Sequence, residues 1–236
     1  MRKTIKIMLV LLCSITLASC GLSNNSIQTQ SYENGGYKIT IATDDNSSLS
    51  QKDMDTITKV LDIRLSSIGI LHKTILLDKD EIHIEIPKSN EFDMSVVKPK
   101  IISMLVKGKF TVQEVDESNI DSDGNYIPTG KVVFDETQIT EAKALEDKMK
   151  NNNISLGLNS TAAVNFEKKT EEMIGKPLGI FLDDKLIVAP TVVAKIEGGN
   201  LVVSGNLNKE DTLRICSIIK SGALPKNLKI KEVIEK

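Results

Sequence analysis

Two adjacent acidic residues, Asp183 and Asp184, interrupt the apolar stretch GKPLGIFLDDKLIVAP at residues 175–190. Paired carboxylates of this kind can act as general acids and bases or bind a metal ion. Here they separate two short apolar runs, and a two-residue polar connection between such runs is typical of a β-hairpin, in which aspartate tolerates the left-handed conformation. We therefore predict that these aspartates turn the chain, with a carboxylate site as the alternative.

The loop NIDSDGNY at residues 119–126 is the stretch that most resembles a cation site. On the calcium-binding EF-hand template, Asn119 takes position 1, Asp121 and Asp123 take positions 3 and 5, and Gly124 takes position 6. Position 12 requires a bidentate glutamate, but Gly130 stands there. We interpret the loop as a turn and expect no metal in it.

The chain has two histidines, His72 and His83, in neighbouring predicted strands. Two imidazoles without a suitably spaced third ligand do not make a zinc site, so we expect both to face solvent. Gly198 and Gly199 precede Asn200 in a pattern typical of a hairpin rather than of a phosphate-binding loop. The sequence contains no nucleophile elbow, zinc-protease motif, phosphate loop or dinucleotide fingerprint. We predict a protein that is not an enzyme and binds no cofactor or small substrate, and a hydrolase is the least favoured alternative.

The N-terminus has the three parts of an export signal: a basic start, MRKTIK, a short apolar run, and the sequence LASC at residues 17–20. LASC resembles the bacterial lipobox, so we predict a signal peptide at residues 1–19 and lipidation of Cys20. Two or three acyl chains there, palmitate among them, give stable attachment to a membrane. The predicted location is the extracytoplasmic face of the cell membrane. An ordinary secretory signal with an incidental cysteine is the alternative.

Cleavage removes Cys13 and lipidation uses the sulfur of Cys20, so one free thiol, Cys216, remains in the mature chain. It lies in an apolar context, and we expect a buried structural thiol rather than a nucleophile. Without disulfides, an exported chain depends on its core, and 236 residues with 40% hydrophobic content can form one. The net charge of −2, the absence of tryptophan and the 3% aromatic content argue against nucleic acid as a partner.

The first part of the chain predicts a β-α-β-β-α-β order after a flexible tether at residues 20–36. Strand 37–43 is followed by a helix that begins with a capping box at Ser50 and Asp53 and ends at Gly69. The remaining predicted elements are strands 70–77 and 82–86, a helix at 91–107 and a strand at 109–115. This order is the signature of a ferredoxin-like split βαβ fold.

A polar break at residues 116–130 separates this unit from a second one. There we predict helices at 138–150, 161–173 and 209–221, and strands at 154–158, 178–182, 185–189, 192–196 and 201–204. Asn208 caps the last helix. The final alternating run at 228–235 needs a sheet, and the first unit offers one.

Several of these stretches resemble SecD, a subunit of the bacterial SecDF protein-export complex. They are GKPLGIFLDDKLIVAP (175–190), the following glycine pair, LVVSGNLNKEDTLRICSIIKSGALP (201–225), VLDIRLSSIGI (60–70) and DEIHIEIP (80–87). The resemblance to the first large extracytoplasmic domain of that family covers nearly all of the chain from Tyr37. It implies an α+β fold in which a ferredoxin-like base, residues 37–116 plus 225–236, carries an inserted α+β head subdomain at 117–224.

The departures from the family pattern shape the expected function. The family has a glycine where Asp184 stands here, and it continues into six transmembrane helices that use the proton gradient, whereas this sequence ends at Lys236. We therefore expect a noncatalytic lipoprotein that binds extended polypeptide in export or in folding after export, with a translocating polypeptide or the Sec translocon as its partner. The residues that bind polypeptide are not identified by the sequence. The alternative is an interaction module that binds a folded envelope partner unrelated to export.

Overall fold

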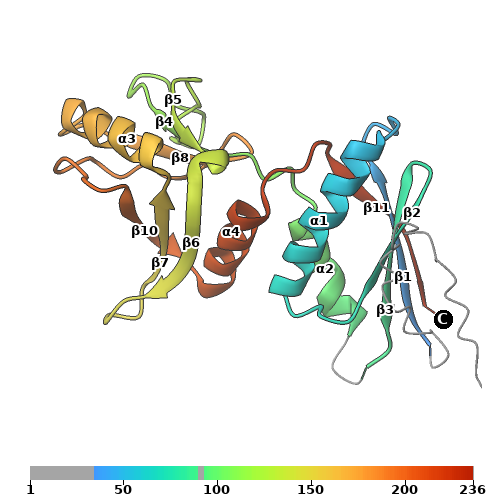
Figure 1. Cartoon of the computed structure of the whole chain (residues 1–236). Coiled ribbons are helices and arrows are strands. Elements are labelled where there is room, and N and C mark those ends of the chain that lie inside the picture. The colour runs from blue at the N-terminus through green and yellow to red at the C-terminus, as the bar shows by residue number, and fades with distance from the viewer. Residues whose placement is uncertain (1–34, 90–92, 236) are drawn as a thin grey trace, which may run out of the picture.

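The computed structural model describes residues 35–89 and 93–235. The predicted signal peptide, Cys20 and nearly all of the predicted tether lie outside these residues. The described chain is a mixed α+β protein with antiparallel sheets, as predicted. Figure 1 shows two parts joined by a narrow waist. We call residues 35–105 and 224–235 the base, and residues 106–223 the head.

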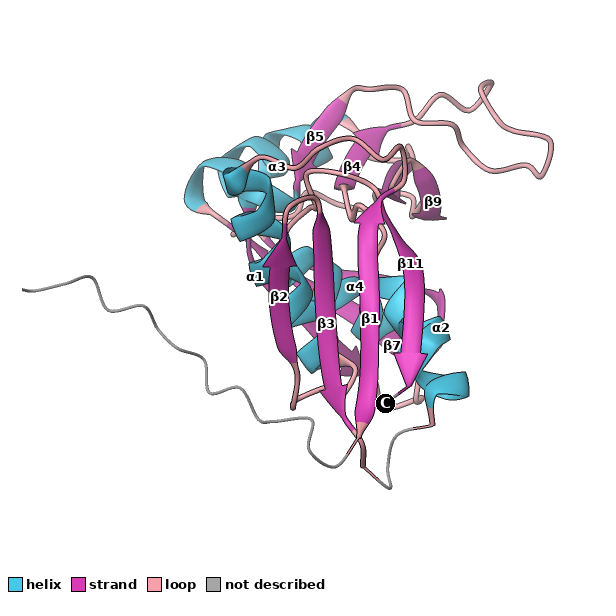
Figure 2. Ribbon diagram, turned by 90° about the vertical axis from the view of Figure 1, so that its right-hand side faces the viewer, coloured by secondary structure: helices cyan, strands magenta, loops and turns pink. Residues whose placement is uncertain are grey.

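The base is one four-stranded antiparallel sheet with two helices on one face. The strands are β1 (Gly36–Thr43), β2 (Thr74–Asp78), β3 (Glu81–Pro87) and β11 (Leu228–Glu235), and the helices are α1 (Gln51–Ser67) and α2 (Met94–Met104). The order across the sheet is β11-β1-β3-β2. Figure 2 shows β11 and β2 at its two edges. The predicted return of the C-terminal strand is confirmed, since Tyr37 pairs with Glu235; the ferredoxin-like type stays a prediction.

Local sequence signals position α1 on this sheet. The Ser50 hydroxyl accepts a hydrogen bond from the Asp53 amide and the Asp53 carboxylate accepts one from the Ser50 amide, so the predicted capping box is confirmed. Gly69 follows the helix with φ +89°. Leu61 and Leu65 of α1 are completely buried against isoleucines of the sheet, such as Ile84. Burial of each such side chain is worth about 1.5–3 kcal/mol.

The head contains two antiparallel sheets and two long helices. One sheet has the order β5-β4-β8-β9 and the other the order β10-β7-β6. Their strands are β4 (Phe110–Glu114), β5 (Val132–Asp135), β6 (Ile139–Glu146), β7 (Asn152–Leu158), β8 (Leu178–Leu182), β9 (Lys185–Val188) and β10 (Asn200–Leu207). The helices are α3 (Ser160–Glu172), α4 (Lys209–Ser221) and the short 3-10 helix η2 (Glu136–Gln138).

A second hydrophobic core fills the head. Phe134 of β5 and Phe166 of α3 meet edge to face with ring centroids 5.2 Å apart, a favoured aromatic geometry. Helix α4 packs on β6 and β7 and also on α1 of the base. Figure 1 shows α4 on the side of the head that faces the base. Ile68, at the end of α1, touches both cores.

The structure corrects three predicted elements. The strand predicted at residues 109–115 is present as β4, but β4 pairs with β5 and β8 of the head and not with the base sheet. Residues 139–146 are the strand β6 instead of a helix, because pairing with β7 and burial of Ala142 outweigh the helix propensity of alanine, glutamate and lysine. Residues 192–196 form no strand.

Candidate functional site at the junction of base and head

Two chain segments cross between base and head, one after α2 and one after α4. The first runs from Leu105 to Lys109 and leads into β4, and the second runs from Gly222 to Asn227 and leads into β11. The two lie side by side, since the Leu224 amide donates to the Lys107 carbonyl at 2.7 Å. Any rotation of the head on the base must act on these two segments.

A single arginine of the base, Arg64 on α1, binds both crossing segments. Its Nη1 donates to the Met104 carbonyl at 2.8 Å and to the Val106 carbonyl at 2.5 Å, and its Nη2 donates to the Gly222 carbonyl at 2.8 Å and to the Lys107 carbonyl at 3.3 Å. Its Nε donates to the Ser221 hydroxyl at 2.9 Å. The planar guanidinium can satisfy all these acceptors at once, which lysine cannot.

Burial of Arg64 is complete, with 0% of the residue exposed. This desolvation lowers the pKa of the guanidinium to about 10, and the nearby Asp183 carboxylate opposes the effect. The side chain therefore stays charged at neutral pH. A buried cation surrounded by carbonyls holds its neighbours in one arrangement, because losing any partner leaves a polar group unpaired.

The aspartates of residues 175–190 lie at the same junction. Asp183 and Asp184 have φ of +50° and +62°, and they join β8 to β9 through the pair Leu182 and Lys185, so the predicted turn is confirmed. Asp183 does more than turn the chain. Its carboxylate accepts hydrogen bonds from the amides of Gly108, at 3.0 Å, and Lys109, at 2.8 Å. Nothing in the sequence points to this contact, because the partners lie 75 and 74 residues away.

A groove of about 920 Å³ lies beside this junction, between the base edge and the head. Its walls are α2, the first crossing segment, the turn of Asp183 and Asp184, and β11. Five lysines and four acidic residues line it, so it has no strong charge of one sign. Among residues 35–89 and 93–235, no group of three metal-binding side chains is found.

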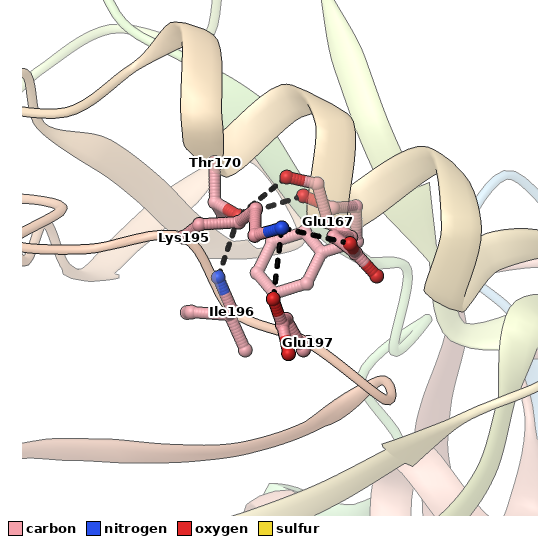
Figure 3. A network of polar contacts seen from close by, with 6 residues as sticks. Glu167, Thr170, Lys195, Ile196 and Glu197 are labelled. Atoms are coloured by element: carbon pink, nitrogen blue, oxygen red, sulfur yellow. Dashed lines mark hydrogen bonds and ion pairs between the residues drawn. The ribbon is translucent and has the colours of Figure 1, made fainter.

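Figure 3 shows a polar network that ties the segment after β9 to α3. Lys195 Nζ lies 2.8 Å from a Glu197 carboxylate oxygen and 3.2 Å from one of Glu167. The Thr170 hydroxyl, completely buried, donates to the carbonyl of Phe166 and accepts from the Ile196 amide at 3.0 Å. These contacts hold residues 195–197, which lie in no strand, against α3.

The predicted histidines do not form a site. His72 is exposed, as expected. His83 is buried, which contradicts the expectation that it faces solvent. The reason is that Thr40 and Leu76 flank it on the neighbouring strands, and its Nδ1 lies 3.2 Å from the Thr40 hydroxyl.

The loop at residues 119–126 is a turn, as predicted. The Asp121 carboxylate accepts hydrogen bonds from the amides of Asp123 and Asn125, and Ile120 bridges to Tyr126. The Asp121 carboxylate thus forms its hydrogen bonds within the loop.

The glycine pair and the free thiol are both packing features. Gly198 and Gly199 have positive φ but follow a segment without strand pairing, so the predicted hairpin is wrong. A Cβ on Gly199 would lie 2.5 Å from the Ala163 Cβ, so glycine allows the close approach to α3. Cys216 is buried in α4, and burial raises the pKa of its thiol to about 11. The expected structural role of Cys216 agrees with this burial.

The comparisons with known proteins agree on one family. Residues 113–226 match the family model "SecDF, P1 head subdomain". The protein translocase subunit SecD of Leptotrichia buccalis is 31% identical over 182 residues, which cover 75% of this chain and 42% of that protein. SecD of Sebaldella termitidis is 25% identical over 233 residues, covering 98% of this chain and 54% of that protein. The chain thus spans about half the length of these relatives, or less.

Solved structures of SecDF share the fold. The super-membrane-facing form of SecDF superposes with a TM-score of 0.72 at 20% identity, covering 85% of this chain and 30% of that chain. A second structure, from a study of SecDF as a membrane component that enhances protein export, superposes with a TM-score of 0.66 at 19% identity and covers 83% of this chain and 98% of that chain. No helix of the described chain is long and apolar enough to cross a membrane. The protein is therefore related to the SecD proteins over most of its length, and residues 113–226 match the SecDF P1 head subdomain.

Proposed function

We propose that this protein binds extended polypeptide at the outer face of the cytoplasmic membrane, without catalysis, as a helper of protein export or of folding after export. The observation that carries the proposal is the match of residues 113–226 to the SecDF P1 head subdomain, in a chain whose base has the SecDF fold as well. The relatives are named as protein translocase subunits, which supports an association with the Sec translocon as part of the proposal.

The sheet edges are the features of the base best suited to binding an extended polypeptide. An extended chain can add a strand to a free edge, where main-chain hydrogen bonds give affinity for many sequences. The base sheet ends in β2 on one side and in β11 on the other. The Arg64 network at the junction gives these edges a fixed position relative to the head.

The lipid anchor is a separate part of the proposal. Cys20, at the end of the lipobox-like LASC, carries the acyl chains and holds the protein at the membrane surface. Metabolic labelling with a clickable palmitate analogue is expected to label the wild type and not the Cys20→Ser variant. Equal labelling of both would refute lipidation at this residue.

Binding of unfolded chains can be measured directly. Fluorescence anisotropy is expected to show binding of reduced, carboxymethylated α-lactalbumin, which cannot refold, and much weaker binding of the native protein with its disulfides intact. Tighter binding of the folded form, or no binding of either, would contradict the function proposed here.

A further inference from the structure

The two edges of the base sheet differ in how they are protected. Strand β11 carries Lys229, Lys231 and Glu232, and its pairing with β1 has an irregularity near Thr40. Lys231 also forms an ion pair with Glu81. Charged side chains and bulges are the usual means by which an edge strand avoids pairing with another chain. The β11 edge is therefore protected.

Strand β2, with the sequence TILLD, lacks these features. Its one charge is Asp78, at the end next to the turn, and its pairing with β3 is regular along all five residues. Leu76 and Leu77, which point to opposite faces of the sheet, are 40% and 38% exposed. Leu71, just before the strand, is 68% exposed. Within the described chain β2 pairs only with β3, so its outer edge has unpaired amides and carbonyls.

The edges of the head sheets are less suitable. Strand β6 carries Glu141, Lys143 and Glu146 along its length. The pairing of β10 is irregular between Ser204 and Leu207. Strands β5 and β9 have four residues each. Among the described strands, β2 thus combines regular pairing, exposed leucines and little charge.

The start of β2 is held rigidly on the base. Lys73 Nζ lies 2.8 Å from an Asp62 carboxylate oxygen and 2.8 Å from the Ser66 hydroxyl, and it donates to the Ile70 carbonyl at 3.2 Å. Only 3% of the Lys73 side chain is exposed. These bonds connect the segment before β2 to α1. An edge that is already ordered loses little entropy when a strand is added to it.

We infer that the outer edge of β2 is the surface on which this protein binds extended polypeptide, by adding one apolar, uncharged segment as a fifth strand of the base sheet. The inference rests on the proposed function and names its site. A second copy of the chain is a poorer occupant, because five residues span about 17 Å and a stable dimer buries about 1,200–2,000 Å². A short edge of this kind supports weak, reversible binding, which suits a chain that must later be released.

The test compares two matched substitutions on opposite edges. Leu76→Lys places a charge on the β2 edge, and Ile234→Lys places the same charge on β11 at a residue that is also 40% exposed. Binding of reduced, carboxymethylated α-lactalbumin to the full chain is measured by anisotropy. Leu76→Lys is expected to weaken binding at least about tenfold, because the side chains of the added strand would flank the lysine and partly desolvate it. Ile234→Lys is expected to change the affinity for the probe by less than about twofold, since this exposed side chain lies away from the bound segment. The probe is acidic, so added positive charge alone would strengthen binding in both variants.

Amide hydrogen exchange of the unmodified protein provides a readout that does not depend on the variants. The unfolded probe is expected to slow exchange in residues 74–78 and not in residues 228–235. Binding that protects only β11 from exchange, or an equal loss of affinity in both variants, would overturn the assignment to β2 but leave the proposed polypeptide binding intact. If no probe binds, the proposed function fails together with its site. A concentration-dependent dimer that Leu76→Lys abolishes would make a second copy the occupant, contrary to the inference.

Discussion

Arg64 in α1 donates a 2.8 Å hydrogen bond to the carbonyl of Gly222, which lies 158 residues further along the chain, directly after α4. The same guanidinium binds the carbonyls of the other crossing segment. One side chain of the base thus holds both connections to the head. We therefore expect this contact to help fix the orientation of the head on the base.

Replacing Arg64 with alanine is expected to lower the free energy of unfolding by about 3 kcal/mol or more, because several buried carbonyls lose a charged donor. Arg64→Lys keeps the charge but cannot make the forked contacts, so it is expected to restore only part of the loss. Urea denaturation measures both. The matched control is Arg214→Ala, which removes a partly exposed i,i+3 ion pair and is expected to cost about 1 kcal/mol or less. Equal costs at the two arginines would contradict this role.

Gly108 faces the Arg64 guanidinium at close range. It has φ +80°, and a Cβ there would lie 2.3 Å from Arg64 Nη2 and 2.6 Å from a methyl carbon of Ile218. Gly69 has a similar φ of +89° with open space around it. Gly69→Ala is therefore expected to lower the free energy of unfolding by about 1–2 kcal/mol, for the left-handed backbone alone. Gly108→Ala is expected to lower it by a further 1–3 kcal/mol, roughly, because the added methyl group overpacks the site. Thermal unfolding of the two variants isolates the close contact, and similar values would count against it.

The two aspartates of the β8–β9 turn are expected to respond differently. Asp183→Ala removes the acceptor of the Gly108 and Lys109 amides and should destabilise the protein by about 1–3 kcal/mol. Asp184→Gly should be neutral or slightly stabilising, because its φ of +62° suits glycine. Urea denaturation compares them. A larger loss at Asp184 than at Asp183 would refute this division of roles.

Sequence patterns predicted the elements far better than their partners. Helices α1 and α4 could be predicted from their capping residues and the spacing of their apolar residues. Such signals lie within a few residues of one another, so a single sequence shows them. The sheet that contains β4, and the strand β6, depend on pairing with distant residues. The contacts of Asp183 and Arg64 were missed for the same reason, since nearly all of their partners are main-chain atoms, which have no signature in the sequence.

Thr170 anchors the irregular segment after β9 to α3, and its hydroxyl accepts from the Ile196 amide. Thr170→Val keeps the shape of the side chain but leaves that amide unpaired. We expect the free energy of local opening of this segment to fall by about 1–2 kcal/mol. Hydrogen exchange of Ile196 should become about tenfold faster or more. Thr137→Val is the control, because its hydroxyl contacts Asp135 at an exposed turn and not this segment. Unchanged exchange at Ile196 would show that Thr170 does not hold it.

The most direct measurement of polypeptide binding is photo-crosslinking during export. A photoreactive amino acid is placed at Leu76 on β2, at Ile102 on α2 or at Val193 in the head, all at least 40% exposed, while a precursor is arrested in the translocon. We expect crosslinks to the precursor from at least the β2 position, well above those from an unrelated surface lipoprotein. No crosslink above that control from any of the three positions would contradict a role in handling exported polypeptide.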